Sequence, residues 1–333
     1  MNNRCLIIAE AGVNHNGKLD LALKLCDEAK RCGADVIKFQ TWKTENLITR
    51  NVSQADYQAR NTGKTESQYD MLKRLELSYD DFRIIKSHCD EIGIIFASTA
   101  DEQQSLDFLI DLGIPFIKVG SGDIGNISYL RYIGEKALPV ILSTGMSTLA
   151  DVDISVRALK EGGATDITLL HCTTNYPCEY ENVNLRAMLT LKNAFGFNVG
   201  YSDHTIGSTV PVAAVTLGAA VIEKHFTLDK NMEGPDHLSS TEPKDFIFMV
   251  NSIRAAEISL GSYIKQPTKE EKDISKVVCK RIVAKKEIKT GDIFDENNIS
   301  VKRNDNGLKA SLWDEVIGRV SCRSYNKDEG ISI

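Results

Sequence analysis

Two histidines end consecutive β-rich runs in the second half of the sequence. His204 directly follows "NVGYSD" (198–203), and His225 lies within "AAVIEKHFT" (219–227). Because adjacent strand ends lie side by side, both imidazoles could face one divalent cation such as Mn, Fe, Co or Zn, with water or substrate in its other positions. Such an open site acts as a Lewis acid or activates a water. Hydrogen bonding that only caps each strand remains the alternative interpretation.

Two lysines lie inside apolar runs, Lys38 in "DVIKFQT" (35–41) and Lys118 in "PFIKVGSG" (115–122). Burying a lysine costs free energy unless an anion meets it, or unless its pKa falls enough to make it a nucleophile. Hydroxyl donors accompany both lysines at Ser121, Ser143 and Ser202. Two cations with several hydroxyls suit a phosphate and a carboxylate. A lysine-dependent aldolase stays open, since a Schiff base needs only one lysine.

Further polar residues could hold a neutral polyol, although each is a weak signal alone: Glu10, Gln40, Asp123 and Asp236. Arg303 lies in "SVKRNDNG", where its local sequence indicates an ordinary solvated arginine.

Eight near-continuously apolar runs must position these residues, and they cover 5–12, 35–41, 93–99, 115–122, 139–145, 166–173, 198–203 and 219–227. This texture is typical of parallel strands buried on both faces. The segments between them show helical periodicity: in 19–34, Leu21, Leu25, Ala29 and Cys32 share one face before Gly33. Eight alternating units predict a (β/α)8 TIM barrel.

Active sites of such barrels lie at the carboxyl ends of the strands. We therefore expect one mouth lined by the polar strand endings Glu10, Lys38, Gln40, Ser98, Thr99, Lys118, Ser121, Ser143, His171, Ser202, His204 and His225. The competing open, doubly wound sheet would place G-x-G-x-x-G after its first strand, and "EAGVNHNG" does not match.

The barrel pattern stops near Gly261, which predicts a barrel domain over 1–262. Residues 263–278 are charged, contain Pro267 and are typical of a linker. Short β pieces with turn signals follow, so we expect a small β-rich domain over 279–333.

The composition excludes several other classes of protein. A net charge of −6 gives no reason to expect nucleic acid or an anionic membrane as partner. No apolar run approaches the ~20 residues of a membrane span, and the amino terminus has too short an apolar core for a signal peptide. Eight scattered cysteines without C-x-x-C indicate reduced thiols. We expect a cytoplasmic protein.

Taken together, the motifs resemble the sialic acid synthases, meaning the N-acetylneuraminate synthases and their legionaminate and pseudaminate relatives. The segments that carry the resemblance are "AEAGVNHNG", "IKFQT", "KVGSGD", "ILSTGM", "LLHCTTNYP", "GYSDHT", "IEKHFTLDK", "GPDH" and "VKRNDNG". They span nearly the whole chain, and the family's small C-terminal module, the SAF (antifreeze-like) domain, fits the β-rich tail.

The resemblance implies metal-assisted condensation of phosphoenolpyruvate with the open-chain aldehyde of N-acetylmannosamine, giving N-acetylneuraminate and phosphate. It implies Mn²⁺, with Mg²⁺ or Co²⁺ as alternatives. An N,N'-diacetyllegionaminate synthase acting on 2,4-diacetamido-2,4,6-trideoxymannose is the second hypothesis. A non-catalytic carbohydrate-binding protein is a third, although it would not need the full set of strand endings.

The resemblance also implies roles for single residues. Matching the metal ligands are His204 and His225. Matching the phosphoenolpyruvate site are Lys38, Thr99, Lys118, Ser121, Ser143 and Ser202. Matching the sugar site are Glu10, Gln40, Asp123, Tyr176 and Asp236, with Glu10 also near the reacting centre. Arg303 matches an arginine that enters the partner's barrel in a domain-swapped homodimer and contacts the sugar's acetamido group.

The chain departs from the family pattern at Ala100, Asp123, Thr174 and Asn304. These departures leave the reaction type in place and leave the exact sugar open. The opening "AEAGVNHNG" looks more like the neuraminate and legionaminate branches than the pseudaminate branch.

Overall fold

The computed structural model describes residues 4–53 and 66–333 of the chain. These residues divide into two compact units, Met1–Gly261 and Ser262–Ile333. Within the described part of the chain, no helix combines the length and the apolar character needed to cross a membrane.

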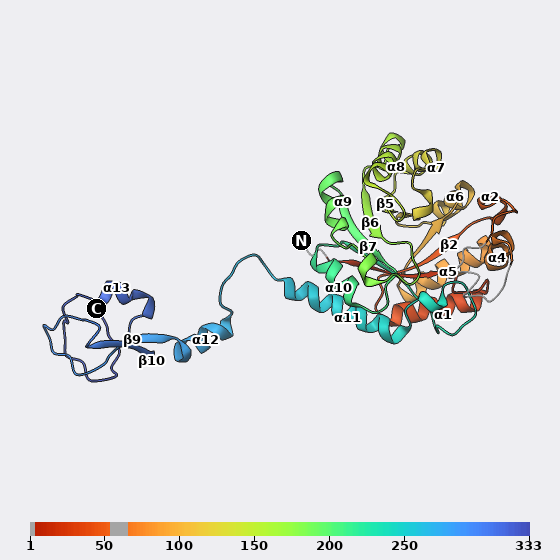
Figure 1. Cartoon of the computed structure of the whole chain (residues 1–333). Helices are drawn as coiled ribbons and strands as arrows, with labels where there is room; N and C mark the ends of the chain where they lie inside the picture. Colours follow the sequence, from red (N-terminus) through yellow and green to blue (C-terminus); the bar gives the residue numbers. More distant parts are fainter. Residues whose placement is uncertain (1–3, 54–65) are drawn as a thin grey trace. The chain divides into compact units, whose positions relative to one another are not determined.

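Eight parallel strands form a closed barrel in the first unit, each hydrogen-bonded to the next, with β8 returning to β1. Helices surround the strands (Figure 1). This architecture confirms the predicted (β/α)8 barrel and rules out the open doubly wound sheet. The strands are β1 (Leu6–Gly12), β2 (Val36–Thr41), β3 (Ile95–Ala100), β4 (Ile117–Val119), β5 (Val140–Ser143), β6 (Ile167–Cys172), β7 (Asn198–Asp203) and β8 (Val221–His225).

The helices form where the sequence alternates buried and exposed residues with helical period. In α1, Ala22, Leu25, Cys26 and Ala29 are buried, and Gly33 follows the helix at a positive φ of 82°. The described helices of this unit are α1 (Leu19–Arg31), α2 (Thr44–Leu47), α4 (Gln68–Leu75), α5 (Tyr79–Ile92), α6 (Gln103–Asp111), α7 (Ile127–Gly134), α8 (Leu149–Gly162), α9 (Ala187–Phe195), α10 (Thr209–Thr216) and α11 (Pro243–Leu260), with short 3-10 turns η1 (Ser121–Asp123), η2 (Tyr180–Asn182) and η3 (His237–Ser239).

The barrel interior is built in layers, because side chains two residues apart on a strand share one face. The lower layer is the apolar cluster of Ile8, Val36, Ala97, Phe116, Ile141, Leu170 and Val221. Two residues further along the same strands come Glu10, Lys38, Thr99, Lys118, Ser143, Cys172 and Glu223. The apolar layer therefore closes the barrel directly beneath a layer of polar side chains.

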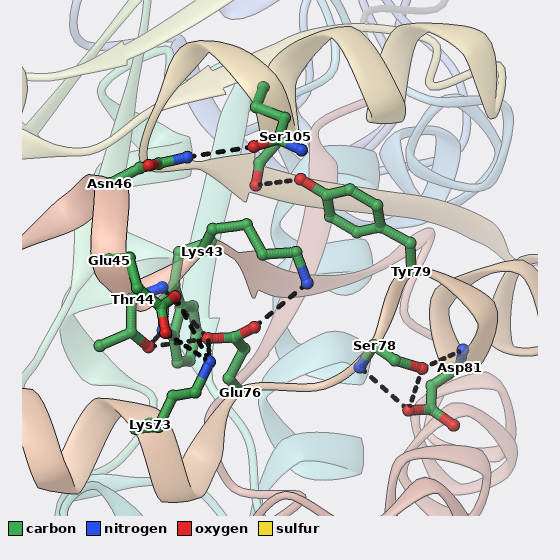
Figure 2. A network of polar contacts seen from close by, with 12 residues as sticks. Lys43, Thr44, Glu45, Asn46, Lys73, Glu76, Ser78, Tyr79, Asp81 and Ser105 are labelled. Atoms are coloured by element: carbon green, nitrogen blue, oxygen red, sulfur yellow. Dashed lines mark hydrogen bonds and ion pairs between the residues drawn. The ribbon is translucent and has the colours of Figure 1, made fainter.

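A network of ion pairs fastens the segment that follows β2. The carboxylate of Glu76 accepts hydrogen bonds from Lys43 (3.1 Å), from the backbone and hydroxyl of Thr44 (3.1 and 2.8 Å) and from Lys73 (3.2 Å). Figure 2 shows these side chains converging on Glu76. The network ties α2 to the end of α4, which fixes the wall beside the carboxyl end of β2.

The second unit contains α12 (Lys269–Val278), the antiparallel strands β9 (Lys280–Ala284) and β10 (Ile299–Arg303), η4 (Ala310–Leu312) and α13 (Trp313–Val316). It has its own apolar core, formed by Ile282, Ala284, Ile288, Phe294, Ile299, Val316, Tyr325 and Ile331. The segment expected to be a linker, 263–278, is helical over α12, because Thr268 and Glu271 form a capping box at its start.

Candidate active site

Four charged side chains meet at the bottom of the barrel mouth. The ammonium of Lys38 lies 2.7 Å from Glu10 Oε2 and 3.7 Å from Glu223 Oε2, and that of Lys118 lies 3.6 Å from Glu223 Oε1. All four side chains are buried, with at most 7% of any one exposed. With both glutamates ionised, two cations and two anions balance, and this buried quartet carries no net charge.

The two carboxyl groups of the quartet differ in proton affinity. Burial, assisted by the nearby charge of Glu223, raises the pKa of Glu10 to about 7 despite the opposing Lys38. Burial would also raise the pKa of Glu223, but the positive charges of Lys118 and Lys38 outweigh burial and lower that pKa to about 2. Carboxyl groups whose pKa values are pushed apart can divide acid–base and electrostatic roles. Glu10 is therefore the carboxyl group suited to proton transfer near neutral pH.

Hydroxyl groups surround the two ammonium groups. Lys38 donates a 2.9 Å hydrogen bond to Thr99 Oγ1, and Lys118 donates a 2.7 Å hydrogen bond to Ser143 Oγ. Ser202 Oγ donates to Glu223 Oε1 at 3.0 Å. An anion bound between the lysines would find these three hydroxyls within the same layer, and the predicted role of Thr99, Ser143 and Ser202 in binding it stays a prediction.

Ser121 lies one level higher, against a glycine turn. Its Oγ accepts a 3.0 Å hydrogen bond from the backbone N–H of Gly145 and lies 3.3 Å from Cys172 Sγ. A Cβ added to Gly145 would lie 2.3 Å from Thr174 Oγ1 and 2.8 Å from Ser121 Oγ. The absence of a side chain at Gly145 therefore lets the turn after β5 approach the site.

The two predicted metal ligands lie together at the top of the mouth. The rings of His204 and His225 are 5.5 Å apart between centroids, and the ring of Tyr176 is 4.2 Å from His204 and 5.6 Å from His225. His204 Nδ1 is 2.7 Å from the Thr173 carbonyl oxygen, so it donates there and leaves Nε2 with its lone pair free to face a ligand.

The protonation state of both imidazoles fits a divalent cation. Burial lowers the pKa of His204, and burial with the neighbouring His204 lowers the pKa of His225 to about 3. Neutral imidazole is the form that binds metals. His225 Nδ1 is buried without a hydrogen-bond partner. Because the described residues contain no group of three or more His, Cys, Asp or Glu side chains arranged for a metal, these two nitrogens would leave the other positions to water or substrate.

The rim of the mouth carries polar groups that face Gly12. A Cβ at Gly12 would lie 3.3 Å from Glu10 Oε1, 3.5 Å from Gln40 Nε2 and 3.8 Å from Asp236 Oδ2, so these three groups from distant parts of the sequence are neighbours. Gln40 donates a 3.1 Å hydrogen bond to Glu10 Oε1. Burial raises the pKa of Asp236 to about 6.

A second part of the rim is acidic. Asp123 lies in η1, accepts a 3.0 Å hydrogen bond from Asn126 and has a pKa raised by burial. Asp101, which is absent from the predicted set, lines the pocket at the barrel mouth, and burial together with the nearby charge of Asp123 raises its pKa to about 7. Asp101 lies two residues after Thr99, so the alternation along β3 is the signal that could have found it.

One pocket of about 200 Å³ contains this arrangement. It is lined by all of the predicted site residues except Asp123, Asp236 and Arg303. Five side chains outside the predicted set also line it: Asp101, Met146, Cys172, Thr174 and Glu223. Arg303 is an exposed residue of β10 in the second unit, so its approach to a barrel mouth stays a prediction.

Two strand-end residues expected at the mouth lie elsewhere. Ser98 hydrogen-bonds to Thr41 at 2.7 Å, and His171 Nε2 hydrogen-bonds to the carbonyl oxygen of Val183 at 2.8 Å. Each immediately precedes a pocket residue on its strand and therefore points to the opposite face. The expectation for Ser98 and His171 was wrong for this reason.

Comparisons with known proteins cover both units. The model of the NeuB family matches residues 25–265, and that of the SAF domain matches residues 281–333. An N,N'-diacetyllegionaminic acid synthase from Campylobacter jejuni is 45% identical over 328 residues, or 98% of each chain. One from Legionella pneumophila is 44% identical over 333 residues, 99% of this chain and 93% of the relative. The crystal structure of an N-acetylneuraminic acid synthetase from Leptospira borgpetersenii is 33% identical with a TM-score of 0.71, over 82% of this chain and 90% of that one.

Proposed function

The chain belongs to the NeuB family and is an enzyme of the synthase class, and from this premise we propose that it joins phosphoenolpyruvate to the open-chain aldehyde of 2,4-diacetamido-2,4,6-trideoxymannose. The products would be N,N'-diacetyllegionaminate and phosphate. The motifs alone place N-acetylmannosamine first and the diacetamido sugar second, and the relatives favour the reverse order. Two legionaminic acid synthases share 45% and 44% identity with this chain, against 33% for the neuraminic acid synthetase.

The observation that carries the proposal is the pairing, in one pocket of about 200 Å³, of two buried lysines with two neutral histidines. Phosphoenolpyruvate carries a carboxylate and a phosphate, which Lys38 and Lys118 can each meet. Thr99, Ser143 and Ser202 offer hydroxyls beside them. When both glutamates are ionised, Glu10 and Glu223 balance the two lysines, so the incoming anion takes over part of the attraction that these carboxylates exert on the ammonium groups.

Carbon–carbon bond formation comes first in the proposed reaction. The C3 carbon of phosphoenolpyruvate attacks the aldehyde carbon, and the aldehyde oxygen takes up negative charge and then a proton. A divalent cation on His204 and His225, which we expect to be Mn²⁺, would polarise that oxygen as a Lewis acid. Tyr176 packs against both rings and would limit the orientation of the sugar chain. The lysines contribute by fixing the nucleophile in a near-attack position.

Glu10 is suited to the second half of the reaction. After attack, C2 of the former phosphoenolpyruvate is an electron-deficient carbon attached to the phosphate oxygen. Water adds to C2 and loses one proton, which leaves a hydroxyl on C2. The bond between C2 and the phosphate oxygen then breaks while this hydroxyl gives its proton to the departing phosphate, and the keto acid and phosphate result. With a pKa of about 7, Glu10 can accept the proton of the water as general base at neutral pH.

The rim fits a sugar with amide N–H donors. The rim carries the carboxyl groups of Asp101, Asp123 and Asp236, and Gln40 lies next to Asp236 and donates a hydrogen bond to Glu10. The proposed sugar carries acetamido groups at C2 and C4, so it offers two such donors. N-acetylmannosamine offers one, and N-acetylneuraminate synthesis is the second candidate because of the likeness to the Leptospira synthetase.

The test is a parallel incubation of the purified full chain with Mn²⁺, phosphoenolpyruvate and either sugar. Phosphate release is measured, and the nine-carbon product is identified by mass. We expect faster release with the diacetamido sugar and none after exhaustive chelation. Faster release with N-acetylmannosamine would establish the second candidate, and release with neither sugar would refute both. Borohydride with substrate should leave the protein mass unchanged, which separates this reaction from a Schiff-base aldolase.

A further inference from the structure

An ion pair lies directly behind the two histidines, on the outer face of the barrel wall. The ammonium of Lys224 contacts the carboxylate of Asp203, and their side chains are only 2% and 0% exposed. Asp203 immediately precedes His204 and Lys224 immediately precedes His225. Asp203 and Lys224 are also partners in the register between β7 and β8. The pair therefore joins the two strands at the point where both histidines begin.

The pair also fastens the turn that follows His204. Asp203 Oδ1 accepts hydrogen bonds from the backbone N–H of Thr205 at 3.0 Å and from its hydroxyl at 2.8 Å. Lys224 donates a 2.7 Å hydrogen bond to the carbonyl oxygen of Thr205. The backbone on both sides of His204 is thus held by side chains whose charges compensate each other.

The backbones of the two histidines are held alike, but their rings are not. The carbonyl oxygen of His204 accepts a 2.8 Å hydrogen bond from Cys178, and that of His225 accepts a 2.7 Å bond from Thr241. The ring of His204 also has a hydrogen bond to the carbonyl oxygen of Thr173. The ring of His225 has its Nδ1 buried without a partner. The orientation of the His225 ring relative to His204 therefore depends on the strands that carry them. Two side-chain links join these strands here: Ser202 to Glu223 at 3.0 Å inside the barrel, and the buried Asp203–Lys224 pair, which lies next to both histidines.

We propose that Asp203 and Lys224 are positioning residues that set the separation and angle of the two imidazoles. This inference rests on the proposed function, in which both imidazoles bind one divalent cation. A buried ion pair contributes little net stability, since the desolvation of both charges offsets their attraction. Its directional contacts instead specify one register, and here that register is the spacing of two ligands.

The chain offers a matched control at the opposite end of the barrel. Arg254 lies 2.6 Å from Asp35, and Asp35 also accepts a 2.9 Å hydrogen bond from the backbone of Ile7. This pair likewise links barrel segments but lies at the amino ends of the strands. The double variants Asp203→Asn/Lys224→Met and Asp35→Asn/Arg254→Met each remove one acid and one base that pair with each other. The control also removes the ion pairs of Arg254 with Glu257 and of Asp35 with Arg4, so it perturbs the barrel at least as much.

The experiment measures Mn²⁺ affinity by calorimetry on the full chain, and phosphoenolpyruvate affinity in the absence of metal. Loss of groups that orient metal ligands typically weakens metal binding by about 10- to 100-fold, and we expect this range for Asp203→Asn/Lys224→Met. Its phosphoenolpyruvate affinity should not change, because the lysine layer is untouched. The control variant Asp35→Asn/Arg254→Met should keep the Mn²⁺ affinity of the wild type, even if its thermal stability falls by as much as that of Asp203→Asn/Lys224→Met.

Unchanged Mn²⁺ affinity in Asp203→Asn/Lys224→Met would overturn the inference. If that variant does not fold, Thr205→Val takes its place, because it removes only the hydroxyl bond to Asp203 and keeps the side-chain shape. Thr205→Val should also weaken Mn²⁺ binding, and wild-type affinity there would refute the positioning role. A wild-type chain that binds no Mn²⁺ while catalysing condensation would instead refute the metal role in the proposed function.

Discussion

Replacing Lys118 by methionine should separate substrate binding from the charge balance of the site. Lys118 lies 3.6 Å from Glu223 and donates hydrogen bonds to Ser143 (2.7 Å) and the Val119 carbonyl oxygen (3.2 Å). Methionine fills most of the same volume without the charge. The variant keeps two carboxyl groups and one lysine in the quartet, so it presents net negative charge to a substrate that is itself an anion.

The expected loss of affinity follows from the lost donor. Hydrogen bonds to charged groups contribute about 1.5–3 kcal/mol, and each ~1.4 kcal/mol is tenfold, so phosphoenolpyruvate should bind about 10- to 100-fold more weakly. Breaking a buried pair costs about 3–5 kcal/mol of stability, and we expect the lower end of about 3 kcal/mol. We expect the lower value because Glu223 is not left without partners in the variant: Lys38 still lies 3.7 Å from its carboxylate, and Ser202 still donates a 3.0 Å hydrogen bond to it.

A second substitution distinguishes the two effects. Adding Glu223→Gln to Lys118→Met restores the charge balance, so most of the lost stability should return while phosphoenolpyruvate binding stays weak. Binding is measured by calorimetry without metal, and stability by urea denaturation. Lys136→Met is the control, because Lys136 pairs with Asp107 at 2.7 Å away from the pocket. Wild-type affinity in Lys118→Met, or full recovery of affinity in the double variant, would refute the role of Lys118 as an anion-binding residue.

Three further predictions concern the turn, the rim and the second unit. Gly145→Ala should raise the KM for phosphoenolpyruvate by about tenfold in steady-state assays, because overpacking by one methyl costs about 1–3 kcal/mol and the new Cβ would displace Ser121. Burial raises the pKa of Asp101 from 3.8 to about 7, so its protonated form favours the folded state and that contribution is lost as pH rises toward 7. Asp101→Asn should therefore match the wild type in urea denaturation at pH 4 and exceed it at pH 8; equal stability at both values would contradict the assignment. Mixing His225→Ala with Arg303→Ala subunits should restore condensation if Arg303 serves the partner's barrel, and no recovery after demonstrated subunit exchange would argue against a domain swap.

Much of the fold follows from features that are local in the sequence. Each apolar run that ends in polar residues corresponds to one strand, because a parallel strand in a barrel is apolar below and polar at its carboxyl end. The two-residue alternation of side chains along each strand could also have predicted which polar residues face the interior. It places Asp101, Cys172 and Glu223 inside the barrel mouth and Ser98 and His171 on the opposite face. The helix α12 was likewise signalled by Thr268 and Glu271, a capping box that the charge of the segment obscured.

Other properties of the site depend on contacts that no local pattern encodes. Glu10 and Glu223 are both buried carboxyl groups next to lysines, yet their pKa values are about 7 and about 2. The difference arises because two lysines outweigh burial at Glu223, while burial dominates at Glu10. The contact between His204 and the Thr173 carbonyl oxygen also joins residues from different strands. These pKa shifts and this hydrogen bond depend on the relative positions of several strands, which no single stretch of sequence specifies.

The charged end of β8 shows how the chain accommodates so many ionisable groups in its core. Glu223 and His225 point into the barrel, where Glu223 meets Lys38 and Lys118, while Lys224 points outward to Asp203. A shift of one residue would exchange the two faces, because the side-chain period of a strand is two. Lys224 would then face Lys38 and Lys118, three cations would share one low-dielectric space, and Asp203 would lose its partner. A shift of β8 by one residue therefore leaves buried charge unpaired on both sides of the barrel wall. The charges that the reaction needs inside the barrel, together with the Asp203–Lys224 pair outside it, make the catalytic register the stable one.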